Sequence, residues 1–179
     1  WAIYGHWTGS IAPFTHADHH ELEYAANGTL FNCNDGTVYK RTATAWQEIA
    51  GLMNISQIYK IGLSSMTANK WITGHQDNGT SIWNGVTYQA RIGGDGMDCF
   101  IDRTTDLNVF GSTQNGGFQR STNGGSSWQG ATTGLSGTAP WVTVWKQDPQ
   151  VSTRLYCGRQ NMFVSNNLAA GWSSLTALP

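Results

Sequence analysis

A short polar turn recurs four times along this chain, each time between two runs rich in apolar residues, Thr and Ser. The four turns are Asn34-Asp35-Gly36, Asp77-Asn78-Gly79, Gln114-Asn115-Gly116-Gly117 and Gln160-Asn161. They stand roughly forty residues apart, and self-similarity at such a period marks an array of small units that cannot each bury an apolar face alone. The repeat therefore decides which loops of the folded chain share a face.

Alternating patterns between these turns predict strands in four sets of four. The predicted strands are 21–24, 29–33, 37–41 and 45–49; 57–64, 70–76, 81–83 and 87–92; 97–103, 108–113, 117–121 and 127–130; and 141–146, 154–158, 163–166 and 172–175. Four-stranded antiparallel units repeated around an axis are the blades of a β-propeller. We therefore predict an all-β fold, a β-propeller segment of about four four-stranded blades that belongs to a larger propeller.

The blade boundaries follow from the same pattern. We expect residues 1–14 to be the end of a preceding blade with its exit loop, and residues 15–179 to be one propeller domain. Its four blades are expected at 15–51, 52–93, 94–135 and 136–179. The chain starts at Trp1 without a Met or a signal peptide, so we expect a processed product or a piece of a longer polypeptide. The remaining blades are expected from that polypeptide or from a partner chain.

Composition excludes several classes of function. Charged residues make up only 12% of the chain and the net charge is −1, which argues against a nucleic-acid partner and against a polybasic membrane surface. No apolar stretch approaches the roughly 18 residues of a membrane span. The 22 Gly and 9 Trp residues are typical of a turn-rich, aromatic all-β protein. Cys33 and Cys157 occupy equivalent strands, and we expect buried free thiols rather than a disulfide or a metal site.

One hairpin carries a sharper signature. Ser121, Asn123, Gly125 and Trp128 are spaced as in the Asp-box, the Ser-x-Asp-x-Gly-x-x-Trp hairpin, with Asn in the Asp place. An Asx side chain there can accept hydrogen bonds from backbone N–H groups of the turn, Gly can adopt positive φ, and Trp can pack between blades. We interpret this hairpin as a structural device, with a loose copy running from Asn166 to Trp172.

Propeller geometry places the turn between the second and third strands of a blade on the same face as the loop leading into its first strand. Most of the unusual Asp, His and Gln residues fall in these segments, so convergent polar groups predict a ligand-binding face there. The predicted ligand-binding residues are His16, Asp18, His19, Asp35, His75, Gln76, Asp77, Asn78, Asp95, Asp98, Gln114 and Gln160.

Four interpretations of this face remain open. His16, Asp18 and His19 could bind a transition metal, and Asp95 with Asp98 could hold Ca²⁺ as a cofactor. Two of Asp18, Asp77 and Asp95 could serve as the catalytic carboxylates of a glycoside hydrolase. Alternatively, all of these side chains only cap turns and join neighbouring blades. Trp7, Trp83 and Trp141 are either sugar-stacking platforms or blade-packing residues.

Taken in order, the motifs resemble the BNR/Asp-box propellers of the sortilin-like superfamily, as found in large secreted Bacteroidetes proteins. The matching segments, which cover roughly residues 14–178, are His16–His20, Asn34–Tyr39, Gly51-Leu52, Gln57–Tyr59, Gln76–Thr80, Gly93–Met97 and Ile101-Asp102. In the first hairpin, Lys40–Trp46 lacks the Asp and Gly of the box, so we expect no Asp-box there. The resemblance implies a secreted or cell-surface protein, and related propellers include xyloglucan-active hydrolases and ligand-binding receptors.

No nucleophile elbow, Walker loop or dinucleotide-binding fingerprint is present. The sequence therefore favours a binding or adhesion module for a glycan or protein ligand over an enzyme. The alternatives are a glycoside hydrolase acting on polysaccharide and a structural propeller within a larger surface assembly.

Overall fold

The computed structural model describes residues 4–51 and 56–175, and its strands form four separate sheets. Each sheet has four antiparallel strands that pair in the order in which they occur in the chain. The chain divides into a first unit, Trp1–Ile55, with one sheet, and a second unit, Ser56–Pro179, with three. No α-helix occurs among the described residues, so the predicted all-β fold of four-stranded antiparallel sheets is confirmed.

The first unit contains β1 (His19–Tyr24), β2 (Leu30–Asn34), β3 (Val38–Arg41) and β4 (Trp46–Glu48). Its interior is small: the buried side chains in the described part of this unit are those of Thr15, Asn32, Tyr39 and Ala50. Thr15 Oγ1 accepts hydrogen bonds from the amides of Asn32, at 3.2 Å, and Asn34, at 3.0 Å. Hydrogen bonds to Thr15 thus help to hold this sheet against the segment that precedes β1.

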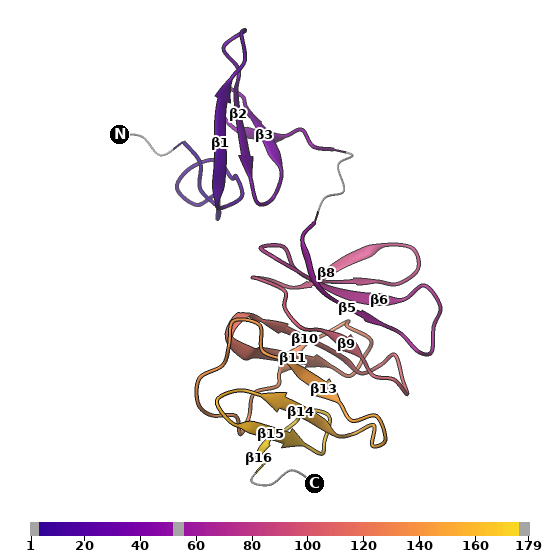
Figure 1. Cartoon of the computed structure of the whole chain (residues 1–179). Coiled ribbons are helices and arrows are strands. Elements are labelled where there is room, and N and C mark those ends of the chain that lie inside the picture. The colour runs from indigo at the N-terminus through magenta and orange to yellow at the C-terminus, as the bar shows by residue number, and fades with distance from the viewer. Residues whose placement is uncertain (1–3, 52–55, 176–179) are drawn as a thin grey trace. The chain divides into compact units, whose positions relative to one another are not determined.

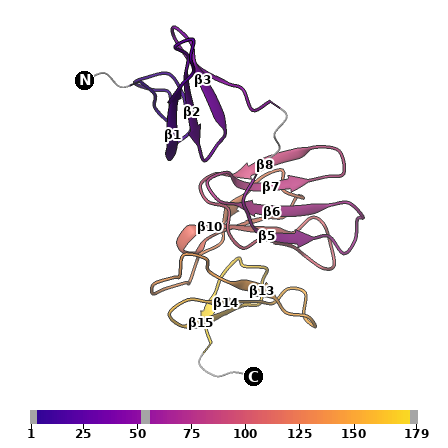
Figure 2. The ribbon, with the colours of Figure 1, turned by 45° about the horizontal axis from the view of Figure 1, so that its top comes forward.

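The second unit begins with the sheet of β5 (Ile58–Leu63), β6 (Trp71–His75), β7 (Gly79–Trp83) and β8 (Tyr88–Ile92). Its next sheet holds β9 (Phe100–Ile101), β10 (Val109–Thr113), β11 (Gly117–Ser121) and β12 (Gln129–Gly130), with the short 3-10 turn η1 (Gln114–Gly116) between β10 and β11. The last sheet holds β13 (Trp145–Gln147), β14 (Leu155–Gly158), β15 (Met162–Ser165) and β16 (Ser173–Ser174). Figure 1 and Figure 2 show these three sheets following one another through the unit.

Alternation along the strands explains how these sheets pack. In β6, Ile72 points into a cluster with Ile82, Cys99, Ile101 and Val109, which joins the β5–β8 sheet to the β9–β12 sheet. Neighbouring residues of a strand point to opposite faces, so Trp71 lies on the other face, where its ring stacks on that of Trp83 with centroids 5.5 Å apart.

A larger aromatic cluster joins the β9–β12 sheet to the β13–β16 sheet. Trp145 is fully buried at its centre and stacks on Phe118, with ring centroids 4.1 Å apart and planes 6° from parallel. Phe110 and Phe100 meet the same indole edge-on. Burying such rings stabilises the pair of sheets by about 2–3 kcal/mol per side chain, so Trp145 is a main source of stability in the second unit.

Candidate functional site

The polar loops of the second unit meet through hydrogen bonds that backbone N–H groups donate. The N–H of Asp77, in the β6–β7 turn, donates to Asp95 Oδ1 at 2.9 Å, and the N–H of Gly96 donates to the carbonyl of His75 at 2.8 Å. The turn between β6 and β7 therefore lies against the loop that leads into β9. Two of the candidate catalytic carboxylates, Asp77 and Asp95, belong to this junction.

This junction leaves no room for a side chain at Gly96. A Cβ built there would lie 1.9 Å from the carbonyl oxygen of Gly79, well inside contact distance. The close approach of the two backbones explains why one loop reads Gly-Gly-Asp-Gly and the other Asp-Asn-Gly. These glycine-rich motifs therefore have a packing role in addition to any role in binding.

A second meeting point surrounds the turn between β10 and β11. Asn115 adopts the left-handed conformation at φ 57°, and its N–H donates to the carbonyl of Trp141 at 3.0 Å. Trp141 is 50% exposed, and Gln114 lies in the same turn as Asn115. In the β14–β15 turn, the N–H of Gln160 donates to the carbonyl of Thr138 at 2.9 Å. We call the surface formed by the β6–β7, β10–β11 and β14–β15 turns, with the loops leading into β9 and β13, the polar face.

His75 lies beneath this face and is buried. Its Nδ1 lies 2.5 Å from Ser56 Oγ, and its Nε2 lies 2.7 Å from Thr73 Oγ1. Burial lowers the pKa of the imidazole from its usual value, because charging the ring in a desolvated site costs free energy. His75 is therefore a neutral hydrogen-bonding residue near pH 7. Gln76, the next residue, accepts a hydrogen bond from Tyr59 Oη at 3.2 Å.

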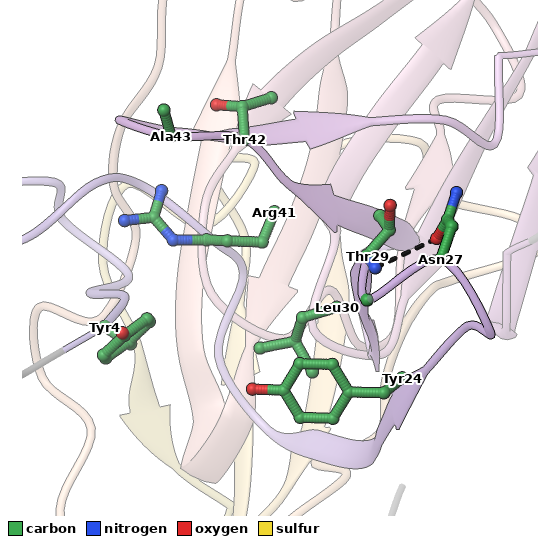
Figure 3. A pocket seen from close by; sticks show the side chains of 9 residues that line it. Tyr4, Tyr24, Asn27, Thr29, Leu30, Arg41, Thr42 and Ala43 are labelled. Carbon is green, nitrogen blue, oxygen red and sulfur yellow. Dashed lines mark hydrogen bonds between the residues drawn. The ribbon is translucent and has the colours of Figure 1, made fainter.

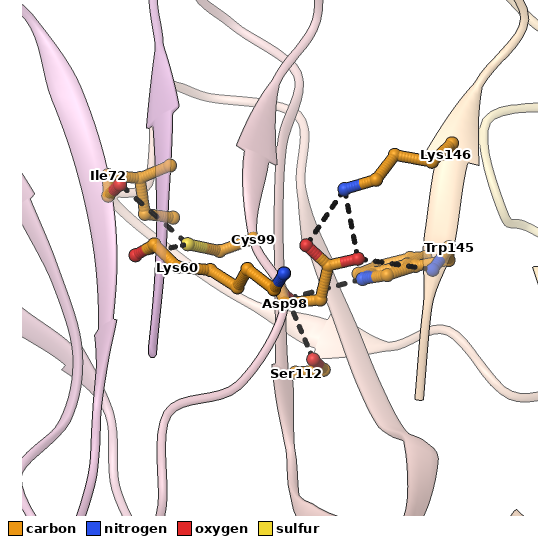
Figure 4. A network of polar contacts seen from close by, with 7 residues as sticks. All are labelled: Lys60, Ile72, Asp98, Cys99, Ser112, Trp145 and Lys146. Carbon is orange, nitrogen blue, oxygen red and sulfur yellow. Dashed lines mark hydrogen bonds and ion pairs between the residues drawn. The ribbon is translucent and has the colours of Figure 1, made fainter. Parts of the chain in front are cut away.

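Asp98 was predicted on the ligand-binding face, but its carboxylate is 1% exposed and faces the neighbouring sheet (Figure 4). Lys146 Nζ donates to both carboxylate oxygens, at 2.9 and 3.0 Å, and the N–H of Trp145 donates to Oδ2 at 3.3 Å. The Asp98 carbonyl accepts a further bond from Ser112 Oγ at 2.7 Å. Asp98 thus joins two sheets, and its charge is already balanced by Lys146. This arrangement disfavours the Ca²⁺ site predicted at Asp95 and Asp98.

Two thiols of the second unit, those of Cys99 and Cys157, are buried. Burial raises the pKa of Cys99 to about 12, with the Asp98 carboxylate adding to the effect. The Cys99 thiol lies 3.7 Å from each of the carbonyls of Lys60 and Ile72 (Figure 4). Burial likewise raises the pKa of Cys157 to about 11. All three cysteines are free, and Cys33 is half-buried.

The predicted site residues of the first unit contact one another at the start of the sheet. The N–H of Asp35 donates to the carbonyl of Asp18 at 3.3 Å, and His20 Nε2 lies within hydrogen-bonding distance of the Asp35 carboxylate. His19 Nδ1 lies 2.9 Å from the side-chain oxygen of Asn32. His16 packs under Gly36, where any Cβ would clash with its ring.

These contacts bear on the transition metal predicted at His16, Asp18 and His19. His19 Nδ1 is engaged by Asn32, and His16 Nδ1 lies 3.3 Å from the carbonyl of Ala17. Each ring could therefore offer only Nε2 to a metal without breaking a contact. The metal site stays a prediction.

The Asp-box geometry is present in both of the last two sheets. In the hairpin joining β11 to β12, the N–H of Gly125 donates to Ser121 Oγ at 2.9 Å, and Asn123 Oδ1 accepts from the N–H of Ser127 at 2.9 Å. In the hairpin joining β15 to β16, Ser165 Oγ accepts from the N–H of Ala169 at 2.9 Å, and Asn167 Oδ1 from Gly171 at 3.0 Å.

The second copy therefore follows the Asp-box hydrogen-bonding pattern more closely than the sequence predicted. Its Asx residue is Asn167, not Asn166. Asn166 instead accepts a bond from Arg154 Nε at 2.9 Å. In the first unit, Thr42 and Ala45 close the β3–β4 hairpin by mutual hydrogen bonds, which confirms that no Asp-box forms there.

Sequence reasoning missed two groups of residues. Lys146, the partner of Asp98, lies forty-eight residues away in the chain and carries no local signal. The residues that line a cavity beside Arg41 in the first unit were also missed, because no spacing rule connects them.

In the described residues, no helix is long and apolar enough to cross a membrane.

Comparison with known proteins identifies the fold. No family model and no curated protein matches the chain. An ancestral GH74 enzyme matches with a TM-score of 0.58 at 17% identity, over 91% of this chain and 24% of its own. The GH74 xyloglucanase of Xanthomonas campestris has a TM-score of 0.54 at 15% identity, over 88% of this chain and 30% of its own. The GH74 enzyme of Niastella koreensis has a TM-score of 0.51 at 16% identity, over 87% of this chain and 29% of its own.

At these identities the likeness shows the fold alone, which is that of a β-propeller. The chain spans less than a third of the length of each of these structures. The four sheets are therefore those of a propeller segment.

Proposed function

We propose that this propeller segment belongs to a secreted or cell-surface protein of the sortilin-like, Asp-box type, and that it binds a ligand through the polar face. Two hairpins with Asp-box hydrogen bonding support the type. In this proposal, the remaining blades come from the same longer polypeptide or from a partner chain.

The observation that carries the binding role is the position of Trp141. Trp141 is half-exposed, and its carbonyl accepts the N–H of Asn115, in the Gln114–Gly117 turn. An exposed aromatic surface next to amide side chains suits a sugar, because the C–H face of a pyranose packs on the ring while its hydroxyls bond to amides. A glycan is therefore the favoured ligand, and a protein is the alternative.

The hydrolase alternative has less support. Asp95 is buried and accepts the N–H of Asp77, so its carboxylate already has a role in joining two loops. The Asp77 backbone adopts φ 57° at a tight turn. Both residues thus fit the structural interpretation of these motifs. Release of reducing ends from xyloglucan, lost on Asp95→Asn, would support hydrolysis instead.

A glycan array followed by calorimetric titration of the best hit tests the proposal. Trp141→Ala should weaken binding at least about tenfold, as loss of a stacking contact worth about 1.4 kcal/mol implies. Trp7→Ala is the matched control, since Trp7 is 64% exposed and lies outside the polar face of the second unit. Equal loss in both variants, or no glycan bound at all, would count against the glycan role and favour a protein ligand or a purely structural propeller.

A further inference from the structure

The first unit contains a cavity of about 360 Å³ at one end of its sheet (Figure 3). The β1–β2 and β3–β4 turns form its rim, and Tyr4, Tyr24, Leu30 and Arg41 line it with residues of those turns. Asp35 and Gly36, in the β2–β3 turn, lie at the opposite end of the same strands. The cavity is therefore separate from the predicted ligand-binding residues of this unit. Its volume falls in the range of roughly 300–1,000 Å³ that small-molecule sites occupy.

Arg41 is the one charged residue among the nine that line the cavity. Its guanidinium carbon lies 5.5 Å from the ring centre of Tyr4 and 5.7 Å from that of Trp46. Trp46 Nε1 also donates to the carbonyl of Tyr4 at 2.9 Å, which ties the two aromatic residues together. Contact with two aromatic rings fixes the faces of a guanidinium and leaves its in-plane N–H groups for hydrogen bonds.

Two of the three guanidinium nitrogens find no acceptor in the part of the chain that the structure describes. Arg41 Nε and Nη1 are covered and have no hydrogen-bond acceptor among the described residues. Arg41 also forms none of the ion pairs found in the described chain. Covering donors of a charged group without an acceptor costs free energy. Because Arg41 also lines the cavity, a negatively charged acceptor there would recover that cost once the side chain turns toward it.

We propose that this cavity binds a carboxylate-bearing sugar, a uronic acid residue of a polysaccharide, with Arg41 holding the carboxylate. The carboxylate engages the guanidinium at its cavity edge, where a small rotation of the side chain gives it two parallel N–H donors. The exposed ring of Tyr24, beside Leu30 in Figure 3, offers a surface for the sugar ring. Thr29, Thr42 and Asn27 offer hydroxyl and amide groups to its hydroxyls.

A sugar suits this cavity better than a bare anion. One cation without a second positive charge is a weak phosphate site, whereas a single carboxylate matches one guanidinium. The tyrosine rings would gain no apolar contact with phosphate, whereas they could pack against the C–H face of a pyranose. This site and its ligand go beyond the binding proposed for the polar face.

The test is calorimetric titration of the full chain with three probes: digalacturonate, its dimethyl ester and inorganic phosphate. We expect digalacturonate to bind, the neutral ester to bind at least tenfold more weakly, and phosphate not to compete. Arg41→Gln should weaken digalacturonate binding at least tenfold. Arg91→Gln is the matched control, since the Arg91 Nε is also buried without an acceptor but that residue lies outside the cavity; it should bind as the parent does.

Other results would overturn the proposal. Equal binding of acid and ester would remove the role of the carboxylate, and competition by phosphate at equal concentration would indicate a plain anion site. If Arg41→Gln does not fold, Tyr24→Ala decides, because that side chain is 68% exposed and its loss should leave the sheet intact. Normal binding by Tyr24→Ala would then refute the site. Trp141→Ala should leave digalacturonate binding unchanged, which separates this site from the polar face.

Discussion

The hairpins that close the last two sheets share one hydrogen-bonding framework but differ in the residues that carry it. In the β11–β12 hairpin, the left-handed positions are Gly124 and Gly125, at φ 71° and 89°. In the β15–β16 hairpin, they are Leu168 and Ala169, at φ 57° and 60°. The Ser and Asn side chains therefore impose the loop even where each residue adopts a conformation that costs about 1 kcal/mol.

Packing explains why one hairpin needs glycine and the other does not. A Cβ on Gly125 would lie 2.3 Å from Ile82 Cδ1 of the neighbouring sheet. The methyl group of Ala169, by contrast, is fully buried within the cluster around Trp145. The neighbouring sheet thus decides whether this position must be glycine.

The largest expected effect is that of Gly125→Ala, which combines a positive φ with the clash against Ile82. We expect it to lower the free energy of unfolding by about 2–4 kcal/mol in urea denaturation. Ile82→Val removes Cδ1, so the double variant should lose less than the sum of the two single variants. Strict additivity would show that the clash does not exist in solution.

The next effect concerns the shared framework. Ser121→Ala and Ser165→Ala each remove a buried hydroxyl that accepts a backbone N–H, at 2.9 Å in both hairpins. Each should lower the unfolding free energy by about 1–3 kcal/mol, and the two losses should be similar. Ser126→Ala, at an exposed position of the first hairpin, is the control and should change little. A loss confined to one hairpin would contradict a common framework.

A third effect depends on pH and involves Asp102, which lies at the contact between the β9–β12 sheet and the β13–β16 sheet. Burial alone would raise the pKa of Asp102, but hydrogen bonds from Gln147, Asn108 and Thr104 outweigh it and hold the pKa below its usual value. The stabilisation is therefore present above the pKa of the unfolded chain, about 3.9, and is lost as the pH falls through the lower folded value.

Asp102→Asn should accordingly flatten the fall of stability in acid, as measured by thermal unfolding between pH 3 and 6. Asp106 and Asp148 also have lowered pKa values, so part of the slope should persist in this variant. An unchanged dependence of stability on pH would mean that the hydrogen bonds to Asp102 stabilise its charged form no better than water does in the unfolded chain.

The smallest effect is that of Ala169→Gly. The change relieves about 1 kcal/mol of left-handed strain but removes a buried methyl group worth about 0.8 kcal/mol. Unfolding free energy should therefore change by less than about 1 kcal/mol. A loss as large as that of Gly125→Ala would show that the two positions are equally constrained.

Much of the fold could be predicted because its signals are local. Alternation and turn residues predict the order of the strands, although β9 and β13 are shorter than the predicted 97–103 and 141–146. Ser121, Asn123 and Trp128 define a hairpin within eight positions. The copy at Ser165 was placed one residue off because Leu168 and Ala169 stand where glycines are expected. The Asp-Asn-Gly and Gly-Gly-Asp-Gly loops do meet in the second unit, as propeller geometry predicts.

The chemistry of the site was harder to predict. Whether a carboxylate faces solvent depends on residues far along the chain: Asp98 is neutralised by Lys146, and nothing near Asp98 indicates this. The sequence also gives no indication that Arg41 lines a cavity, because Tyr4 and the β1–β2 turn come close to it only in the folded unit. Local patterns thus identify loops, while long-range contacts decide the state of each side chain.

The sequential pairing of strands has a consequence for how this protein folds. β proteins commonly fold slowly because distant segments must find one another before any contact is gained. Here every sheet is made from one continuous stretch of chain, so its hydrogen bonds can close as soon as that stretch is available. We therefore expect the long-range step to be the docking of these sheets around Trp145, driven by hydrophobic burial.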